Sequence, residues 1–204
     1  RIPLAGQVIA KPRWQNHAID MVQVRAVFNE EEISFLLEWD DPFKDTTHDV
    51  TREIHEFENT YVMAVDEIPR ERDVFRDSVA LQFPVKLKSG AKKPHFFRGD
   101  TSNPVNLWVW KSDLDDAGSN PVVDSNANGF KKPLKAQPEA GQQVQGKGVW
   151  KNGRWRVVMK RSLQTGERGD IQFKKGEMIP MAFNAWDGSN GEHGMIMSLS
   201  AWSF

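Results

Sequence analysis

The alternation of apolar and polar residues predicts a chain made mostly of short β-strands. Over 21–39, apolar side chains recur at every second position on either side of a polar turn at 29–32, which is the pattern of a β-hairpin. A second hairpin is predicted over 149–161, because the dipeptide Asn152-Gly153 separates two apolar arms and favours a tight two-residue turn.

Further strands are predicted where the same two-residue period returns. The segment 1–13 alternates weakly, 77–85 alternates clearly and contains a proline near its end, and 105–111 reads VNLWVWK. Successive side chains of a strand point to opposite faces, so we expect Trp108 and Trp110 on one face of the last of these strands.

The C-terminal quarter of the chain predicts another hairpin. Apolar arms at 179–186 and 195–202 flank a long tip of turn-forming residues, DGSNGEHG, at 187–194. Both arms are rich in Met, Trp and Phe, so we expect both to be buried. Met195 and Met197 share one face of the second arm, where thioethers either fill a core or bind a soft metal.

Together these segments favour an all-β fold of about eight to ten short strands without a long amphipathic helix. We expect residues 1–204 to form a single domain, an antiparallel β-sandwich with long loops and few short helices. The segment 112–148 is rich in Asn, Asp, Gly, Pro and Gln, and we expect it to be a long surface loop.

Composition and charge exclude several classes of protein. The formal net charge is -1, so no overall field attracts nucleic acid, and no apolar run reaches the roughly 20 residues of a membrane span. The absence of cysteine excludes disulfides, thiol catalysis, covalent c-type haem attachment and iron–sulfur ligation by this chain. Since the sequence begins at Arg1 without a signal peptide, we expect that an N-terminal segment has been removed.

Catalysis by this chain alone is not expected, because it contains no nucleophile elbow, zinc-protease helix or phosphate-binding loop motif. Three local patterns could hold a metal, and each also has a plain structural explanation. His48 and His55 lie among carboxylates in 43–59, which also reads as a solvated face. The tip at 187–194 is acidic but lacks the spacing of an EF-hand loop. His95 stands beside two phenylalanines, where a histidine is either a packed imidazole or a ligand.

Four motifs, in order along the chain, carry a resemblance to a known family. They read DSVALQFPV, PHFFRGDTSNPVNLWVWK, WRVVMKRSL and PMAFNAWDGSNGEHGMIMSLSAW, and the similarity extends from about Val22 to the C-terminus. They resemble the motifs of the ethylbenzene dehydrogenase-related haem-binding family, which includes gamma subunits of dimethylsulfide, ethylbenzene, selenate, chlorate and nitrite oxidoreductases. The resemblance implies a β-sandwich that holds one non-covalent haem b between its sheets, in an electron-transfer subunit that is not itself catalytic.

The same resemblance implies partners and a location. The haem of such a subunit passes electrons between the iron–sulfur subunit of a molybdenum enzyme complex and a cytochrome c that is either soluble or fused. We therefore expect a molybdenum-enzyme catalytic subunit and an iron–sulfur subunit as partners, and a periplasmic or otherwise extracytoplasmic location. Neither nucleic acid nor a membrane span of this chain is expected.

The haem ligands do not carry over directly from the family pattern. The pattern has a Met where this chain has Arg98, and a Lys on the last strand near Ile196 and Met197. The nearest side chains that bind iron are His95 and Met197, with Met195 as the alternate on the same face, and a His/Met pair is an established haem ligation.

A porphyrin also needs apolar walls and cations for its propionates. The expected walls are Phe96, Phe97, Trp108, Trp110, Met181 and Phe183, and the expected cations are Arg98, Lys93 and Lys111.

Two other functions fit the same residues. A carbohydrate-binding module would use exposed tryptophans as a platform for sugar rings, and the chain has eight tryptophans. A haem-free structural or assembly subunit would explain the missing family ligands and would use the segment 112–148 to wrap a partner.

Overall fold

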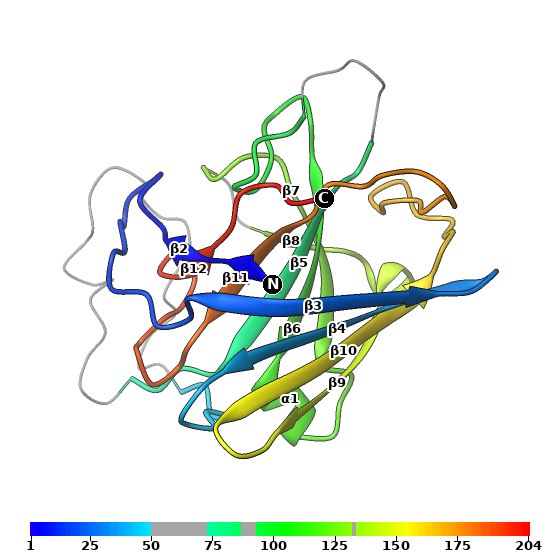
Figure 1. The fold of residues 1–204 in the computed structure, drawn as a ribbon. Coiled ribbons are helices and arrows are strands. Elements are labelled where there is room, and N and C mark those ends of the chain that lie inside the picture. The colour runs from blue at the N-terminus through cyan, green and yellow to red at the C-terminus, as the bar shows by residue number, and fades with distance from the viewer. Residues whose placement is uncertain (50–72, 87–92, 132–133) are drawn as a thin grey trace.

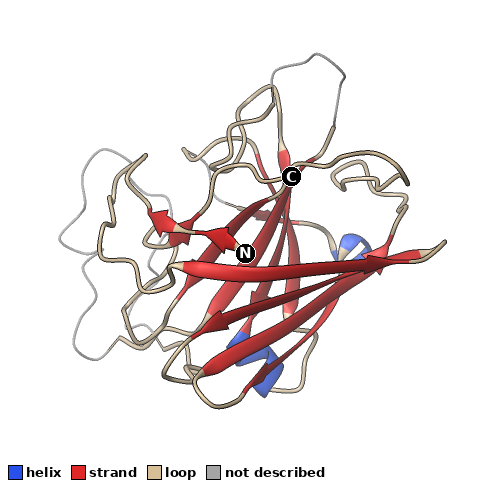
Figure 2. Cartoon of the chain, in the orientation of Figure 1, coloured by secondary structure: helices blue, strands red, loops and turns tan. Residues whose placement is uncertain are grey.

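Two antiparallel β-sheets pack face to face and form a sandwich (Figure 1, Figure 2). The computed structural model describes residues 1–49, 73–86, 93–131 and 134–204. Strands dominate the described residues, and the helices are single turns. The sequence prediction of an all-β antiparallel sandwich is confirmed.

The smaller sheet contains five strands in the order β1-β3-β4-β10-β9. It is built from β1 (Ile2–Pro3), β3 (Met21–Phe28), β4 (Glu32–Asp40), β9 (Gln145–Trp150) and β10 (Arg154–Ser162). The two predicted hairpins are the β3–β4 and β9–β10 pairs. Asn152 and Gly153 join the second pair with φ of 56° and 70°, the positive values that a tight hairpin turn requires. Both hairpin predictions are confirmed.

The larger sheet contains seven strands in the order β2-β12-β11-β5-β6-β7-β8. It is built from β2 (Ala5–Gly6), β5 (Ser78–Pro84), β6 (Val105–Lys111), β7 (Val122–Ala127), β8 (Lys135–Ala136), β11 (Ala182–Trp186) and β12 (Ser198–Leu199). The predicted C-terminal hairpin is the β11–β12 pair, in which Asn184 lies opposite Leu199. Its second arm is shorter than the sequence indicates.

An inner core of large aromatic side chains fills the space between the two sheets. The five-stranded sheet contributes Phe35, Leu37, Trp39, Trp155, Val157 and Met159, and the seven-stranded sheet contributes Val79, Leu81, Phe83, Trp108, Trp110, Phe183 and Ala185. The ring of Trp108 lies 5.2 Å from that of Phe83 and 5.8 Å from that of Phe35. Trp110 lies 4.9 Å from Trp155. Ring centroids at these distances are in direct packing contact.

A second apolar group, the outer cluster, covers the opposite face of the seven-stranded sheet. It contains Ala10, Ala80, Phe97, Val105, Leu107, Val109, Ala127, Trp186, Met195, Met197 and Leu199. On β6 the members alternate with Trp108 and Trp110, as the two faces of a strand require. The seven-stranded sheet is therefore buried on both faces, which explains why every residue of β5 and β11 is buried.

The segment 112–148 is not the long surface loop that its composition indicates. It forms helix α1 (Ser112–Asp116), strands β7 and β8, the 3-10 helix η2 (Glu139–Gly141) and the beginning of β9. Asp124 and Ser125 of β7 are buried polar residues, so this strand lacks the apolar alternation on which the prediction depended. No helix of the described residues is long and apolar enough to cross a membrane.

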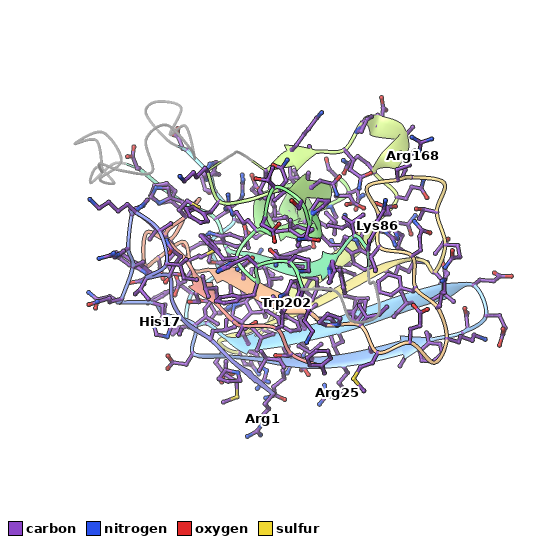
Figure 3. All side chains as sticks on the ribbon, turned by 90° about the horizontal axis from the view of Figure 1, so that it is seen from above. Arg1, His17, Arg25, Lys86, Arg168 and Trp202 are labelled. Atoms are coloured by element: carbon purple, nitrogen blue, oxygen red, sulfur yellow. The ribbon has the colours of Figure 1, made fainter. Side chains whose placement is uncertain are left out.

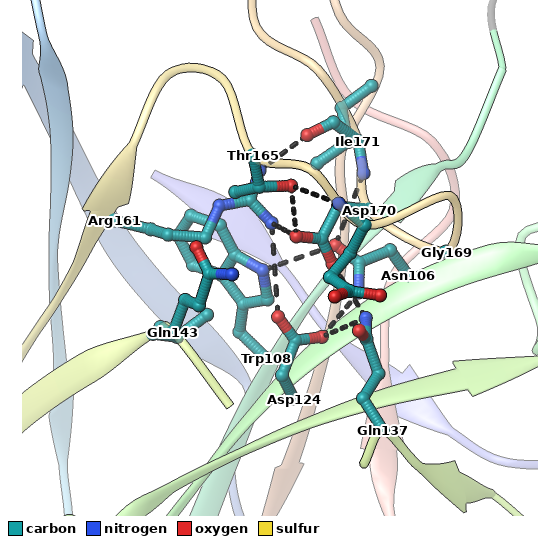
Figure 4. Close-up of polar contacts among 12 residues, drawn as sticks. Asn106, Trp108, Asp124, Gln137, Gln143, Arg161, Thr165, Gly169, Asp170 and Ile171 are labelled. Atoms are coloured by element: carbon teal, nitrogen blue, oxygen red, sulfur yellow. Dashed lines mark hydrogen bonds and ion pairs between the residues drawn. The ribbon is translucent and has the colours of Figure 1, made fainter. Parts of the chain in front are cut away.

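A buried polar network joins β7 to β10 and explains how those polar residues are accommodated (Figure 4). The Asp124 carboxylate accepts hydrogen bonds from the Asn106 amide at 2.5 Å and the Gln137 amide at 3.1 Å. Arg161 of β10 lies 3.8 Å from the same carboxylate and 3.1 Å from that of Asp170. Buried polar groups are tolerated when they are paired in this way.

Candidate functional site

A pocket of about 620 Å³ opens near the C-terminal end of the chain. It is lined by Lys93, Pro94, His95, Phe96, Asp100, Ser102, Asn103 and Trp202. Its size is within the range of small-molecule and cofactor sites, which run from roughly 300 to 1,000 Å³. Trp202, labelled in Figure 3, comes from the last residues of the chain, whereas the other residues belong to the segment before β6.

A tight turn over His95 to Gly99 shapes one side of this pocket. The Gly99 amide donates to the His95 carbonyl at 2.9 Å, and Arg98 and Gly99 both have positive φ, at 58° and 69°. The buried Gln82 side chain of β5 fixes the turn to the sheet, donating to the Phe96 carbonyl at 2.6 Å and accepting from the Arg98 amide at 3.1 Å. The pocket wall is therefore anchored to a central strand.

The Asp100 carboxylate and the Trp202 indole hold the remaining walls. Asp100 accepts from the backbone amides of Ser102 and Asn103, each at 3.1 Å, which closes a second turn directly before β6. The Trp202 indole N–H donates to the Pro94 carbonyl at 2.8 Å and so joins the chain end to the histidine turn. Two segments about 100 residues apart thus form one site.

Of the two iron ligands expected from the sequence, His95 is the one that lines the pocket. Its imidazole is exposed and stacks on the Phe96 ring with a centroid distance of 4.7 Å. Its Nδ1 accepts from the Phe97 amide at 3.1 Å, so the neutral ring carries its proton on Nε2. Binding iron through Nε2 therefore requires the Phe97 hydrogen bond to break or the ring to turn over.

Met195 and Met197 do not lie in the pocket. Both thioethers are buried in the outer cluster, with exposed fractions of 4% and 0%. Gln7 fixes their backbone, because its side-chain amide donates to the Met195 carbonyl and its backbone amide to that of Met197. Phe96 and Trp202, which line the pocket, also pack against this cluster. The two methionines thus lie in the packing layer that supports the pocket walls.

The three expected cations lie in three different places. Lys93 lines the pocket, with its ammonium 4.0 Å from the centre of the Phe204 ring. Arg98 is buried, and its guanidinium donates to the Gly194 carbonyl at 3.2 Å. Lys111 ends β6, at the opposite end of that strand from the pocket. Of the three, Lys93 is the one that could meet a ligand carboxylate in the pocket.

The six expected apolar wall residues are divided between the two faces of the seven-stranded sheet. Phe96 and Phe97 pack with the outer cluster. Trp108, Trp110, Met181 and Phe183 belong to or pack against the inner core. The structure therefore does not bring the six together around one slot, and the inner core between the sheets is filled by the chain's own rings.

The residues that sequence reasoning missed are Asp100, Ser102, Asn103 and Trp202. The first three belong to the motif GDTSNPVN and the last to the motif SLSAW, both of which carried the family resemblance. The convergence of two such motifs was the signal that could have identified this pocket. The sequence also suggested a metal site at His48 and His55. The His48 ring lies 6.0 Å from the Phe75 ring, centroid to centroid, and His55 lies outside the described residues.

Comparisons with known proteins agree with the family resemblance of the motifs. The family model described as ethylbenzene dehydrogenase matches residues 1–135 and 131–198. A protein of Haloferax mediterranei, named as a heme subunit of a respiratory nitrate reductase, is 25% identical over 201 residues, which cover 98% of this chain and 61% of that protein. The chlorate reductase subunit gamma of Ideonella dechloratans is 30% identical over 125 residues, which cover 61% of this chain and 47% of that subunit. The chain thus spans less than two thirds of the length of these relatives.

Proposed function

Because this chain belongs to the ethylbenzene dehydrogenase family, we propose that it is a non-catalytic electron-transfer subunit that holds one non-covalent haem b in the pocket beside His95. Two relatives support this proposal by their names, one as a heme subunit of a nitrate reductase and one as the gamma subunit of a chlorate reductase. The observation that carries it is an exposed imidazole in a pocket of about 620 Å³ with aromatic walls.

The pocket residues fit a haem in their chemistry. His95 would supply a nitrogen ligand to the iron, and Phe96 and Trp202 would supply flat apolar surfaces. Lys93 offers a cation for a propionate. When bound, a haem supplies a one-electron carrier, for which the protein must provide a rigid, shielded seat with one edge near the surface. Gln82 and the Trp202 indole supply that rigidity, because each anchors a pocket wall by a hydrogen bond.

The proposed partners are the molybdenum-containing catalytic subunit and the iron–sulfur subunit of a reductase complex, together with a soluble or fused cytochrome c. The proposed location is periplasmic or otherwise extracytoplasmic. These proposals rest on the family and on the relatives' names.

A carbohydrate-binding function is less well supported. All eight tryptophans lie among the described residues, and none of them is exposed. The pair that the sequence suggested as a platform, Trp108 and Trp110, is fully buried in the inner core. The exposed pair of indoles expected for sugar stacking is therefore absent from the described residues, and the half-buried Trp202 is the one indole that lines the pocket.

The test is a visible spectrum of the dithionite-reduced full chain, with a pyridine haemochrome assay on the same sample. We expect a b-type haemochrome at about one haem per chain, and loss of the sharp reduced bands in His95→Ala. His17→Ala is the matched control, because His17 pairs with Asp20 at 3.1 Å and does not line the pocket.

Met197→Leu tests the second ligand predicted from the sequence. Loss of the low-spin bands in this variant would support thioether ligation, and an unchanged spectrum would exclude it. A chain that stays colourless after haem is added would contradict the electron-transfer proposal and favour a haem-free structural subunit.

A further inference from the structure

Three carboxylates converge at the end of the sandwich that lies away from the pocket. Asp41 follows β4, Asp77 precedes β5 and Asp187 follows β11, so three segments distant in the sequence meet there. One oxygen of each carboxylate lies within 4.8 Å of the others. The three side chains are buried, with exposed fractions of 1%, 0% and 5%.

No basic side chain of the described residues forms an ion pair with these three carboxylates. Three acidic side chains are thus buried together where the described residues supply no cation.

Asp41 adds an independent sign of a missing ligand. Its Oδ1 accepts from the Phe43 amide at 3.1 Å, but its buried Oδ2 makes no hydrogen bond of normal geometry, and the nearby Trp39 indole N–H, which favours the charged carboxylate, also lacks a partner of normal geometry. Buried carboxylate oxygens are normally paired, and an unpaired one within an acidic cluster points to a bound cation.

Hydrogen bonds fix the three carboxylates in place. Asp77 accepts from the backbone amides of Gly188 at 3.0 Å and Asp45 at 2.8 Å. Asp187 accepts from the Ser189 hydroxyl at 2.6 Å. Glycine is required at position 188, where the chain passes close to Phe75, because a Cβ there would overlap the Phe75 carbonyl oxygen. The cluster is therefore a rigid structure rather than a group of mobile surface acids.

We propose that Asp41, Asp77 and Asp187 bind a calcium ion that ties the three segments together. The donor set consists of oxygen atoms, which hard cations prefer, and it lacks the nitrogen and sulfur ligands that zinc favours. Oxygens at about 2.3 to 2.6 Å from a calcium ion lie at most about 5 Å from one another, so a spread within 4.8 Å allows all three to contact one ion.

This site is separate from the proposed haem pocket. Ser112, which follows β6, donates to the Asp45 carbonyl at 2.6 Å beside the cluster, whereas the pocket residue Asn103 precedes β6 at its other end. The tip 187–194, which lacks EF-hand spacing, supplies one ligand of a site whose other ligands come from distant segments. The expected role of the ion is structural.

The test uses the full chain after chelation, titrated with terbium and with calcium. The Trp155 indole donates to Asp77 at 2.9 Å, so tryptophan excitation should sensitise the luminescence of bound terbium. We expect one ion per chain, competition of calcium with terbium, and a rise of several degrees in Tm at saturating calcium, because an ion that binds only the folded state stabilises it.

Substitutions localise the effect. Asp41→Asn and Asp187→Asn should abolish the calcium-dependent rise in Tm, while Asp124→Asn, a matched buried carboxylate outside the cluster, should keep it. A chelated wild-type chain that takes up neither terbium nor calcium and shows no shift in Tm would overturn the proposal, even if the variants fail to fold. An equal calcium response in Asp41→Asn and the wild type would also overturn it.

Discussion

The guanidinium of Arg161 lies 3.1 Å from the carboxylate of Asp170, and neither side chain is accessible to solvent. The same guanidinium lies 4.9 Å from the Trp108 ring centre, so a charged pair is packed directly against the aromatic inner core. The Thr165 hydroxyl and the Gln137 amide donate to the same carboxylate, each at 2.6 Å. This pair therefore links β10 to the segment that precedes the C-terminal hairpin.

Removal of the cation from this pair should strongly destabilise the protein. We expect Arg161→Met to lower the free energy of unfolding by about 3–5 kcal/mol, because it leaves buried carboxylates without their countercharge. The measurement is urea unfolding followed by tryptophan fluorescence. Lys160→Met is the control. The Lys160 ammonium lies 3.4 Å from the Glu32 carboxylate, and both side chains are more than 40% exposed. We expect this substitution to lower the free energy of unfolding by less than about 1 kcal/mol. Equal losses in the two variants would contradict this account.

The pH dependence of stability should carry a contribution from Asp124. Burial and the charge of Asp170 raise the pKa of Asp124 to about 7 from an ordinary value of 3.8. Between these two values the folded chain holds a proton that the unfolded chain has released, so stability falls as the pH rises through this window. Asp124 alone can lower the free energy of unfolding by at most about 1.4 kcal/mol for each unit of pH rise.

Unfolding of wild type and Asp124→Asn from pH 4.5 to 7.5, at one calcium concentration, measures that contribution. The difference between the two proteins isolates Asp124 from the other buried acids. We expect the stability of the wild type to fall more steeply with pH than that of the variant. Parallel pH profiles would show that Asp124 does not retain its proton in the folded state.

A glycine of β9 should be required by the inner core. A Cβ at Gly148 would overlap the indole of Trp110, which is fully buried and cannot move aside. We expect Gly148→Ala to lower the free energy of unfolding by about 1–3 kcal/mol. The control is Gly166→Ala, because a Cβ at Gly166 would meet nothing within 4 Å. A neutral Gly148→Ala would mean that the two sheets can separate locally at little cost.

The sequence was sufficient to predict strands whose two faces differ in polarity and strands that are joined by a recognisable turn. The alternation over 21–39 and the Asn152-Gly153 turn predicted two hairpins that are confirmed. Strand β7 was missed because its buried face carries Asp124. The Asp124 carboxylate can be buried because it contacts Asn106 and Arg161, which are distant from it in the sequence. A single-sequence pattern cannot reveal pairing of that kind.

The candidate pocket could be predicted only in part. His95 was identified from its place in a motif that resembles the family, three residues before Arg98, and it lies in the pocket. Alternation placed Trp108 and Trp110 on one face of a strand, but it could not show that Phe97 and Met197 pack against the opposite face of the same sheet. Which face a loop covers is decided by tertiary contacts, here by the Gln82 hydrogen bonds that hold the histidine turn to β5.

The edges of the two sheets affect how this chain can associate with other chains. Three of the four edge strands, β1, β2 and β8, contain two residues each. The fourth edge, β9, carries Gly146, Gly148 and the largely exposed Lys147. Short edges and edge lysines are the features by which β proteins resist aggregation through strand addition. However, β1 pairs with Met21 and Val22 alone, so among the described residues the outer edge of β3 stays open over 23–28 and carries the exposed Val27 and Phe28. A partner strand that adds to this fold would therefore be expected at β3 rather than at the other described edges.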